Sequence, residues 1–275
     1  MADAQPANAP AVDSHAHIFT RAMPFARDAH SRPTYDYPVE AWLADLDRHG
    51  IGRGVIAAAS LFDDGNAYTL AALAAHPRLR ATILAGPDTS ARELRALADQ
   101  GVVGVRLTWR RLTDLPGLAD APWRGFLGRL ADCGMHVELL AGSAQLPVLL
   151  PQLLAAPVRL VVDHFGVPSR DETERRAGTD ALLRAVQSGA AWVKISAGFR
   201  MPWEIAAECT ARLLAEAGPG RLLWGSDAPF VNHEAAMDYA GTLALYLRLV
   251  PDAEMRRVID SSALALFFNL RSHDQ

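Results

Sequence analysis

AVDSHAHIF, residues 11–19, combines the apolar composition of a buried β-strand with two histidines, His15 and His17, that stand one residue apart. Side chains two residues apart in a strand point to the same face, so both imidazoles are expected to lie together, with Asp13 on that face too. Two core histidines bonded to backbone carbonyls would be the structural explanation, and a pair of ligands or bases the functional one. The rest of the chain decides between them.

Seven more short apolar runs follow, separated by longer amphipathic segments, and this alternation is typical of βα units around a parallel sheet. Eight strands favour a closed (β/α)8 barrel of the TIM type, and the segment after Asp252 is expected to form closing helices. The alternative is an open doubly wound sheet, which needs a glycine-rich loop after the first strand, and residues 18–28 contain no glycine. The predicted strands lie within residues 11–19, 53–60, 79–86, 102–109, 135–142, 159–166, 191–198 and 221–229.

Composition narrows the class of protein. The chain has 275 residues, of which 50% are hydrophobic and 21% charged, with a formal net charge of -4. Such a balance argues against a nucleic-acid or membrane surface and favours a small-molecule partner. No secretory signal or membrane-spanning run is recognisable, which predicts a cytoplasmic setting. Residues 1–11 are expected to be a disordered tail and residues 12–275 a single barrel domain.

Polar residues gather at the ends of the predicted strands. His164 follows the run RLVVD, and Asp227 follows RLLWGS. In a (β/α)8 barrel the carboxyl ends of the strands form the catalytic face, so these two residues are expected to meet His15 and His17 there. Three imidazoles and a carboxylate can hold a divalent cation; alternatively, the carboxylate can act as general base on water while the imidazoles polarise a carbonyl.

Arg106 stands inside the apolar strand run VVGVRLTW. Burying a guanidinium without an anion is costly, so a bound carboxylate is expected beside it. A surface arginine paired with helix carboxylates is the structural alternative for the arginines that follow at 110 and 111.

The stretches DSHAHIF, GVRLTWRR, DHFG, VKISAGFR and WGSDAPF occur in the order found in the amidohydrolase superfamily, and the chain resembles its amidohydrolase-2 branch of pyrone-dicarboxylate lactonases. The resemblance implies a somewhat distorted (β/α)8 barrel with a hydrolytic centre. It assigns the catalytic roles to His15, His17, His164 and Asp227, and the binding of substrate carboxylates to Arg106, Arg111, Arg200 and Tyr35.

Two positions depart from that branch. Val167 stands where the lactonase pattern carries another arginine, and Tyr35 or Tyr37 could supply the tyrosine of the first loop. A lactone with fewer carboxylates, such as a sugar-acid lactone, therefore fits the chain as well as a pyrone dicarboxylate does.

The family commonly binds one or two divalent ions, and this chain offers Glu138 and Lys194 as further polar residues on middle strands. A binuclear site is undersupplied with ligands, because His136 lies at the wrong end of its strand. A single Zn²⁺ or other divalent ion could be held by His15, His17 and Asp227. The lactonase branch implies no obligatory cofactor.

The sequence thus predicts a hydrolase that opens the lactone of a small carboxylic acid resembling 2-pyrone-4,6-dicarboxylate, by attack of water with Asp227 as general base. Catabolism of aromatic compounds or sugars is the expected setting, and a homodimer is left open. A metal-dependent nonoxidative decarboxylase of an aromatic or muconate acid is the second hypothesis. A barrel that binds a ligand without catalysis is the third.

Overall fold

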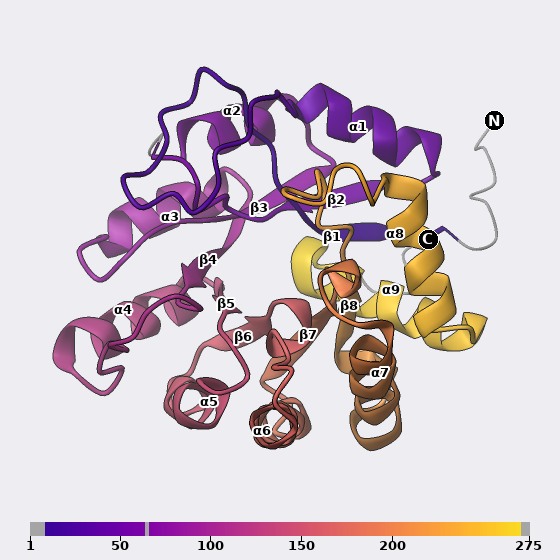
Figure 1. Cartoon of the computed structure of the whole chain (residues 1–275). Helices are drawn as coiled ribbons and strands as arrows, with labels where there is room; N and C mark the ends of the chain where they lie inside the picture. The colour runs from indigo at the N-terminus through magenta and orange to yellow at the C-terminus, as the bar shows by residue number, and fades with distance from the viewer. Residues whose placement is uncertain (1–8, 64–65, 271–275) are drawn as a thin grey trace.

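A ring of parallel strands surrounded by helices forms the body of the protein (Figure 1). The computed structural model describes residues 9–63 and 66–270. Within these residues, consecutive strands pair in parallel in one eight-stranded sheet, and each lies inside a predicted run, which confirms the predicted barrel. The strands are β1 (Val12–Ala16), β2 (Arg53–Ile56), β3 (Leu79–Ile83), β4 (Val102–Thr108), β5 (His136–Leu140), β6 (Arg159–Val162), β7 (Ala191–Ile195) and β8 (Leu222–Trp224).

Helices cover the outside of the ring (Figure 1). Local sequence explains their limits: Ser90 and Glu93 form a capping box at the start of one helix, and Gly101 takes a φ of 95° just after its end. The helices are α1 (Val39–Arg48), α2 (Ala67–Ala75), α3 (Ala91–Asp99), α4 (Ala121–Asp132), α5 (Leu146–Leu154), α6 (Glu172–Gln187), α7 (Trp203–Ala217), α8 (Tyr239–Leu249) and α9 (Ala253–Phe268), with short 3₁₀ turns η1 (His164–Gly166), η2 (Gly198–Arg200) and η3 (Pro219–Arg221).

The last helix, α9, closes the end of the barrel at which the strands begin. Val12, Val55 and Leu223, from β1, β2 and β8, pack in one buried cluster with Phe267 of α9. His136, the first residue of β5, lies at this end with its ring 5.6 Å from that of Phe267. The predicted closing helix is confirmed, and it seals the end opposite the strand termini that carry the predicted site.

The barrel has a seam between its first and last strands. Among the described residues, β8 and β1 are joined by an isolated bridge between Ala16 and Ala228 instead of a continuous ladder. Two backbone bonds flank it, from Asp227 N to the His15 carbonyl and from His17 N to the Ala228 carbonyl, both 2.8 Å. The barrel is therefore distorted as expected, and its seam lies where the histidines of β1 meet Asp227.

A bulge in β1 changes which side chains face the interior. Asp13 pairs with Gly54 and Ala16 with Ile56, so β1 has one residue more than β2 over this stretch. Asp13 consequently points outward and accepts hydrogen bonds from Trp42 of α1 and Tyr239 of α8. The prediction that Asp13 shares the face of the histidines is wrong, because strict alternation does not continue through a bulge.

Asp13 instead reinforces the seam. Its carboxylate accepts bonds of 2.8 Å from the Ser226 amide and 2.6 Å from the Ser226 hydroxyl. Burial nevertheless raises the pKa of Asp13, and these hydrogen bonds work against that rise. The outward residue of β1 thus fixes the backbone immediately before Asp227.

At the amino end, the predicted disordered tail falls largely on residues 1–8, which lie outside the described residues. Ala11, which was assigned to the tail, donates its amide to Asp260 of α9 at 3.0 Å. Within the described part of the chain, no helix has both the length and the apolar character needed to cross a bilayer.

Candidate active site

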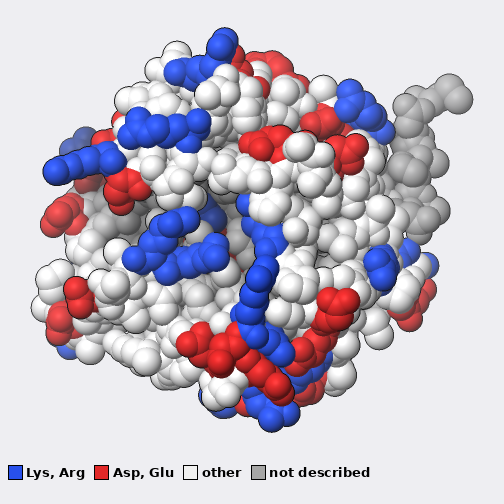
Figure 2. Space-filling view, in the orientation of Figure 1, with Lys and Arg blue, Asp and Glu red and all other residues white. Residues whose placement is uncertain are grey.

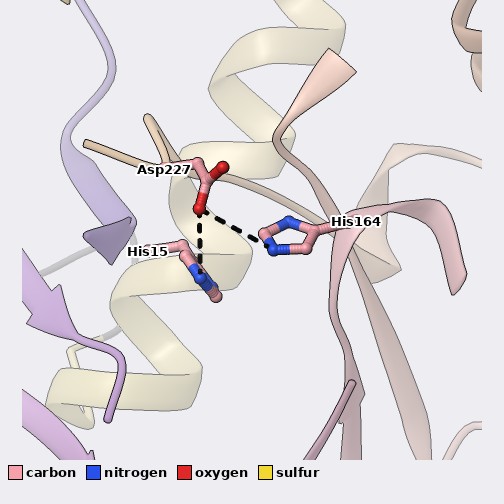
Figure 3. Close-up of side chains that lie close together, drawn as sticks. All are labelled: His15, His164 and Asp227. Atoms are coloured by element: carbon pink, nitrogen blue, oxygen red, sulfur yellow. Dashed lines mark ion pairs between the residues drawn. The ribbon is translucent and has the colours of Figure 1, made fainter. Parts of the chain in front are cut away.

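Three imidazoles surround one carboxylate oxygen at the carboxyl end of the barrel. The Nε2 atoms of His15, His17 and His164 lie 3.7, 3.6 and 3.8 Å from Oδ1 of Asp227. The two histidines come from β1 and its end, His164 opens η1 after β6, and Asp227 follows β8. Figure 3 shows the Asp227 carboxylate between the rings of His15 and His164. The four predicted catalytic residues are therefore brought together.

The backbone bends sharply where it delivers these residues. His164, Ala197 and Asp227, each shortly after β6, β7 or β8, have φ values of 53°, 55° and 61°. Residues other than glycine adopt this left-handed region at an energetic cost, and such strain is concentrated at functional sites. The surrounding fold must hold these turns, which fixes the directions of the His164 and Asp227 side chains.

Arg200 holds the second oxygen of Asp227. Its Nε donates to Oδ2 at 2.6 Å, while another guanidinium nitrogen donates to the Val231 carbonyl at 2.9 Å. Arg200 was predicted to bind a substrate carboxylate, and here it binds the protein's own. The ion pair leaves Oδ1 of Asp227 turned toward the imidazoles.

Burial and charge set the protonation states of the site. Burial alone would raise the pKa of Asp227, but His164, Arg200 and the other imidazoles outweigh it and hold the pKa well below its usual range. Burial lowers the pKa of His15 well below its usual value and that of His164 to about 4. At neutral pH the site therefore contains an ionised Asp227 beside the neutral imidazoles of His15 and His164.

Beneath this layer lies a buried network of two cations and two carboxylates. Lys194 Nζ lies 2.5 Å from Glu138 Oε2 and 3.3 Å from Asp163 Oδ1. Arg106 approaches Glu138 Oε1 at 3.1 Å and Asp163 Oδ2 at 3.0 Å, and it donates to the Ala58 carbonyl at 2.7 Å. The anion expected beside Arg106 is thus present, but the protein supplies it.

The two carboxylates of the network differ. Burial and the neighbouring charge of Asp163 raise the pKa of Glu138. Burial opposes ionisation of Asp163 as well, yet Lys194, His15 and Arg106 together hold its pKa well below the usual range. Asp163 is consequently the more firmly ionised of the pair, and it also lies 3.2 Å from Nδ1 of His15.

A cavity of about 120 Å³ opens above the histidines, lined by His17, His164, Arg106, Arg200 and Asp227 among others. It shares Arg110, His164 and Arg200 with a neighbouring cavity of about 380 Å³ over the loops after β5, β6 and β7. Lys and Arg side chains gather around a hollow near the centre of the face seen in Figure 2. The site is therefore open on one side to a basic surface.

Sequence reasoning missed three polar residues that line the smaller cavity, namely His30, Ser60 and Asn232. They lie in the loops after β1, β2 and β8, and that location at the carboxyl ends of strands was the available signal. His30 is exposed, yet burial of part of its ring and the nearby Arg111, Arg110 and Arg200 lower its pKa.

The remaining two predicted substrate residues lie elsewhere. Arg111 is exposed and does not line either of these two cavities, where Arg110 takes the position instead. Tyr35 donates its hydroxyl to Glu234 at 2.8 Å and lines a separate cavity of about 480 Å³ between α1 and the loop before α8. Neither side chain reaches the imidazoles.

Two sets of described residues have the composition and spacing of a metal site. One is His15, His164 and Asp227; the other is His15, Glu138 and Asp163, and within each set the ligand atoms lie within 4.8 Å of one another. His15 Nε2 is buried without a hydrogen-bond partner among the described residues, as a vacant ligand atom would be. By donor type the first set fits a divalent ion. His17, which was predicted as a ligand, lies outside both sets.

The fold and the site together define an amidohydrolase: the amidohydrolase family model matches residues 12–268, and the chain belongs to this family. A relative from Comamonas testosteroni, named 2-pyrone-4,6-dicarboxylate hydrolase, is 29% identical over 90% of this chain and 86% of its own. A 4-sulfomuconolactone hydrolase from Rhizobium radiobacter is 28% identical, with the same coverages of 90% and 86%.

Among solved structures, a probable 2-pyrone-4,6-dicarboxylic acid hydrolase from Acinetobacter baumannii, with citric acid bound, superposes with a TM-score of 0.89. It is 29% identical and covers 96% of this chain and all of its own, 100%. The similarity therefore extends over the whole barrel.

Proposed function

We propose that this protein hydrolyses a lactone of a small organic acid, with Asp227 as the general base. One observation carries the proposal: Oδ2 of Asp227 is fixed by Arg200, while Oδ1 faces three imidazoles at the floor of a cavity rimmed by arginines. An ionised carboxylate in that position can take a proton from water. The names of the two curated relatives, both lactone hydrolases, support the same reaction class.

The chemistry follows from the protonation states. Water attacks the lactone carbonyl carbon as Asp227 Oδ1 accepts one of its protons, and the carbonyl oxygen takes up the negative charge. When the tetrahedral intermediate collapses, the bond from this carbon to the ring oxygen breaks. Asp227 returns the proton to the departing oxygen, which leaves a hydroxy acid. Lactone and water are consumed in equal amounts, and Asp227 ends as it began.

The proposed substrate carries an anionic group. The lactones in the names of both relatives carry carboxylate or sulfonate groups, and the wall shared by the two cavities here carries Arg110 and Arg200. Arg106 lines the smaller cavity and is proposed to face the substrate while it remains paired with Asp163. We propose that the positive charge of Arg111 acts on the anionic substrate from a longer distance, at the rim. For Tyr35 we propose that its hydroxyl fixes the position of Glu234.

A divalent ion is not required by this proposal. If one binds, His15, His164 and Asp227 would hold it, in place of the predicted set with His17. Such an ion would polarise the carbonyl oxygen and lower the pKa of a bound water. The protein's own groups would still have to orient the lactone and exclude bulk water.

The test is hydrolysis of 2-pyrone-4,6-dicarboxylate, 4-sulfomuconolactone, muconolactone and an aldonolactone, each with and without a chelator. Asp227→Asn is expected to lower kcat about 10²- to 10⁴-fold, the usual contribution of a positioned base, with folding retained. Asp260→Asn, the same change at the closed end of the barrel, is the matched control and is expected to leave kcat unchanged. Full activity of Asp227→Asn would refute the mechanism. Release of CO₂ from an aromatic or muconate acid, only with bound metal, would favour the decarboxylase alternative.

A further inference from the structure

Nδ1 of His15 lies beside two groups of the buried network, one a hydrogen-bond donor and the other an acceptor. Its Nδ1 lies 3.0 Å from Nζ of Lys194, which can only donate a hydrogen bond while charged, and 3.2 Å from Oδ1 of Asp163, which can only accept one. A neutral imidazole carries its proton on one nitrogen. Whichever neighbour controls Nδ1 therefore decides whether Nε2, the atom that lies 3.7 Å from Oδ1 of Asp227, is a donor or a lone pair.

Counting donors around Lys194 resolves the conflict. Its ammonium donates to Glu138 Oε2 at 2.5 Å and can donate to His15 Nδ1 at 3.0 Å, whereas Asp163 Oδ1 lies 3.3 Å away as an ion-pair partner and has no hydrogen-bond partner among the described residues. A proton on Nδ1 would point at an ammonium N–H across 3.0 Å, which is repulsive. Asp163 does not depend on His15, because Arg106 donates to its other oxygen at 3.0 Å.

The surroundings of His17 favour the opposite tautomer. Its Nδ1 lies 2.8 Å from the carbonyl oxygen of Ala57, which can only accept, so the proton of a neutral ring stays on Nδ1. Nε2 of His17 is then a lone pair, 3.6 Å from Oδ1 of Asp227. Two acceptors at that separation can bind the two hydrogens of a single water molecule.

We propose that the two histidines of the HAH motif take opposite tautomers: His15 presents Nε2–H to the lactone carbonyl oxygen, and His17 presents an Nε2 lone pair to the attacking water. Lys194 is the positioning residue that fixes this arrangement through His15. The catalytic roles rest on the proposed lactone hydrolysis, whereas the tautomers rest on the hydrogen-bond geometry alone. Nε2 of His15, which has no hydrogen-bond partner among the described residues, thereby acquires a substrate oxygen as its acceptor when the lactone binds.

The arrangement also bears on metal binding. An ion held by His15, His164 and Asp227 needs a lone pair on His15 Nε2, which requires the ring proton to move to Nδ1, against Lys194. Lys194 therefore favours the donor form of His15 and opposes a metal ligand at this position.

The direct test is nitrogen NMR of the intact protein labelled with ¹⁵N-histidine, at neutral pH and with a chelator present. His15→Gln and His17→Gln assign the two rings among the nine histidines. The proton is expected on Nε2 of His15 and on Nδ1 of His17. A proton on Nδ1 of His15 overturns the proposal, as does the same tautomer in both rings.

Substitution tests the role of Lys194. Lys194→Met leaves two buried carboxylates with Arg106 as their one cation in the network, which could prevent folding. The double variant Lys194→Met/Glu138→Gln, which removes one charge of each sign, is therefore tested as well. In whichever variant folds, the proton of His15 is expected to move to Nδ1, opposite Asp163. Zn²⁺ affinity, measured by calorimetry, is expected to rise about 10- to 100-fold, the range for residues that orient a metal-ligating histidine. Addition of His15→Gln should abolish that gain.

Activity supplies a third readout. Loss of the Nε2–H donor should lower kcat about 10²- to 10³-fold, as for the loss of one oxyanion donor. If the wild-type protein opens no lactone but its tautomers are as stated, the proposed function fails and the histidine assignment stands. An unchanged His15 tautomer in the folded variants would overturn the role of Lys194.

Discussion

At the amino ends of the strands, Val12, Val55 and Leu223 pack against Phe267 of α9. Two or three residues further along β1, β5 and β7, the interior is occupied by His15, Glu138 and Lys194. The lower layer gains stability from apolar burial without any need for partners. The upper layer balances buried charges, which costs desolvation and is retained where function requires it. The same strands thus serve stability at one end and chemistry at the other.

A buried and a partly buried carboxylate illustrate the contrast. Asp227 is surrounded by imidazoles and Arg200, which hold its pKa well below the usual range despite its burial. Asp260 of α9 accepts one bond from the Ala11 amide, and burial raises its pKa to about 7. Asp227 is the more deeply buried of the two, yet it is the one held ionised, so the neighbouring charges decide whether the group stays ionised.

Phe267→Ala should give the largest change at the closed end. Truncating a buried phenylalanine typically costs about 3–5 kcal/mol of unfolding free energy, and kcat per folded molecule should be unchanged because the site lies at the other end. Urea unfolding together with active-site titration measures both. Val258→Ala, on an exposed part of α9, is the control and should change stability by less than about 0.5 kcal/mol. A drop in kcat for Phe267→Ala would mean that the two ends are coupled.

Asp260→Asn should have a smaller, pH-dependent effect. The folded pKa of about 7 exceeds the ordinary value of 3.8, so the folded state binds more protons than the unfolded state between these values, and stability is lost as pH rises. The Asn variant should therefore be more stable than wild type at pH 8, on the order of 2–4 kcal/mol, and the gap should narrow toward pH 5. A gap that does not change between pH 5 and pH 8, measured by urea unfolding, would show that Asp260 does not titrate there.

The smallest change is expected in the pH profile of the active site. Asp227 is held ionised and His164 has a pKa of about 4, so neither group changes protonation between about pH 5.5 and 8. Neither group should therefore give kcat/KM on a lactone an inflection over that range, and their protonation should lower it only in more acidic solution. An inflection near pH 6 to 7 would show that an imidazole of ordinary pKa takes part, and would weaken the contrast with Asp260.

Residue patterns alone predicted the strands, the closing helix and the meeting of His15, His17, His164 and Asp227, because hydrophobic alternation and strand ends are local properties of the chain. They did not predict which carboxylates form ion pairs with Arg106 and Arg200. Asp163 and Asp227 become their partners only when distant strands close into a ring. Tyr35 was misplaced for a similar reason. A loop of the first βα unit can turn toward either of two cavities, and Glu234 lies at the other one.

The bulge in β1 separates two tasks within four residues of the sequence. Asp13 and His15 are two positions apart, yet one faces the outer helices and the other the interior, which the regular alternation of an unbulged strand would not allow at this spacing. Removal of Ser14 would delete the extra residue and make Asp13 and His15 adjacent, so ordinary alternation would then keep them on the opposite faces that the bulge gives them now.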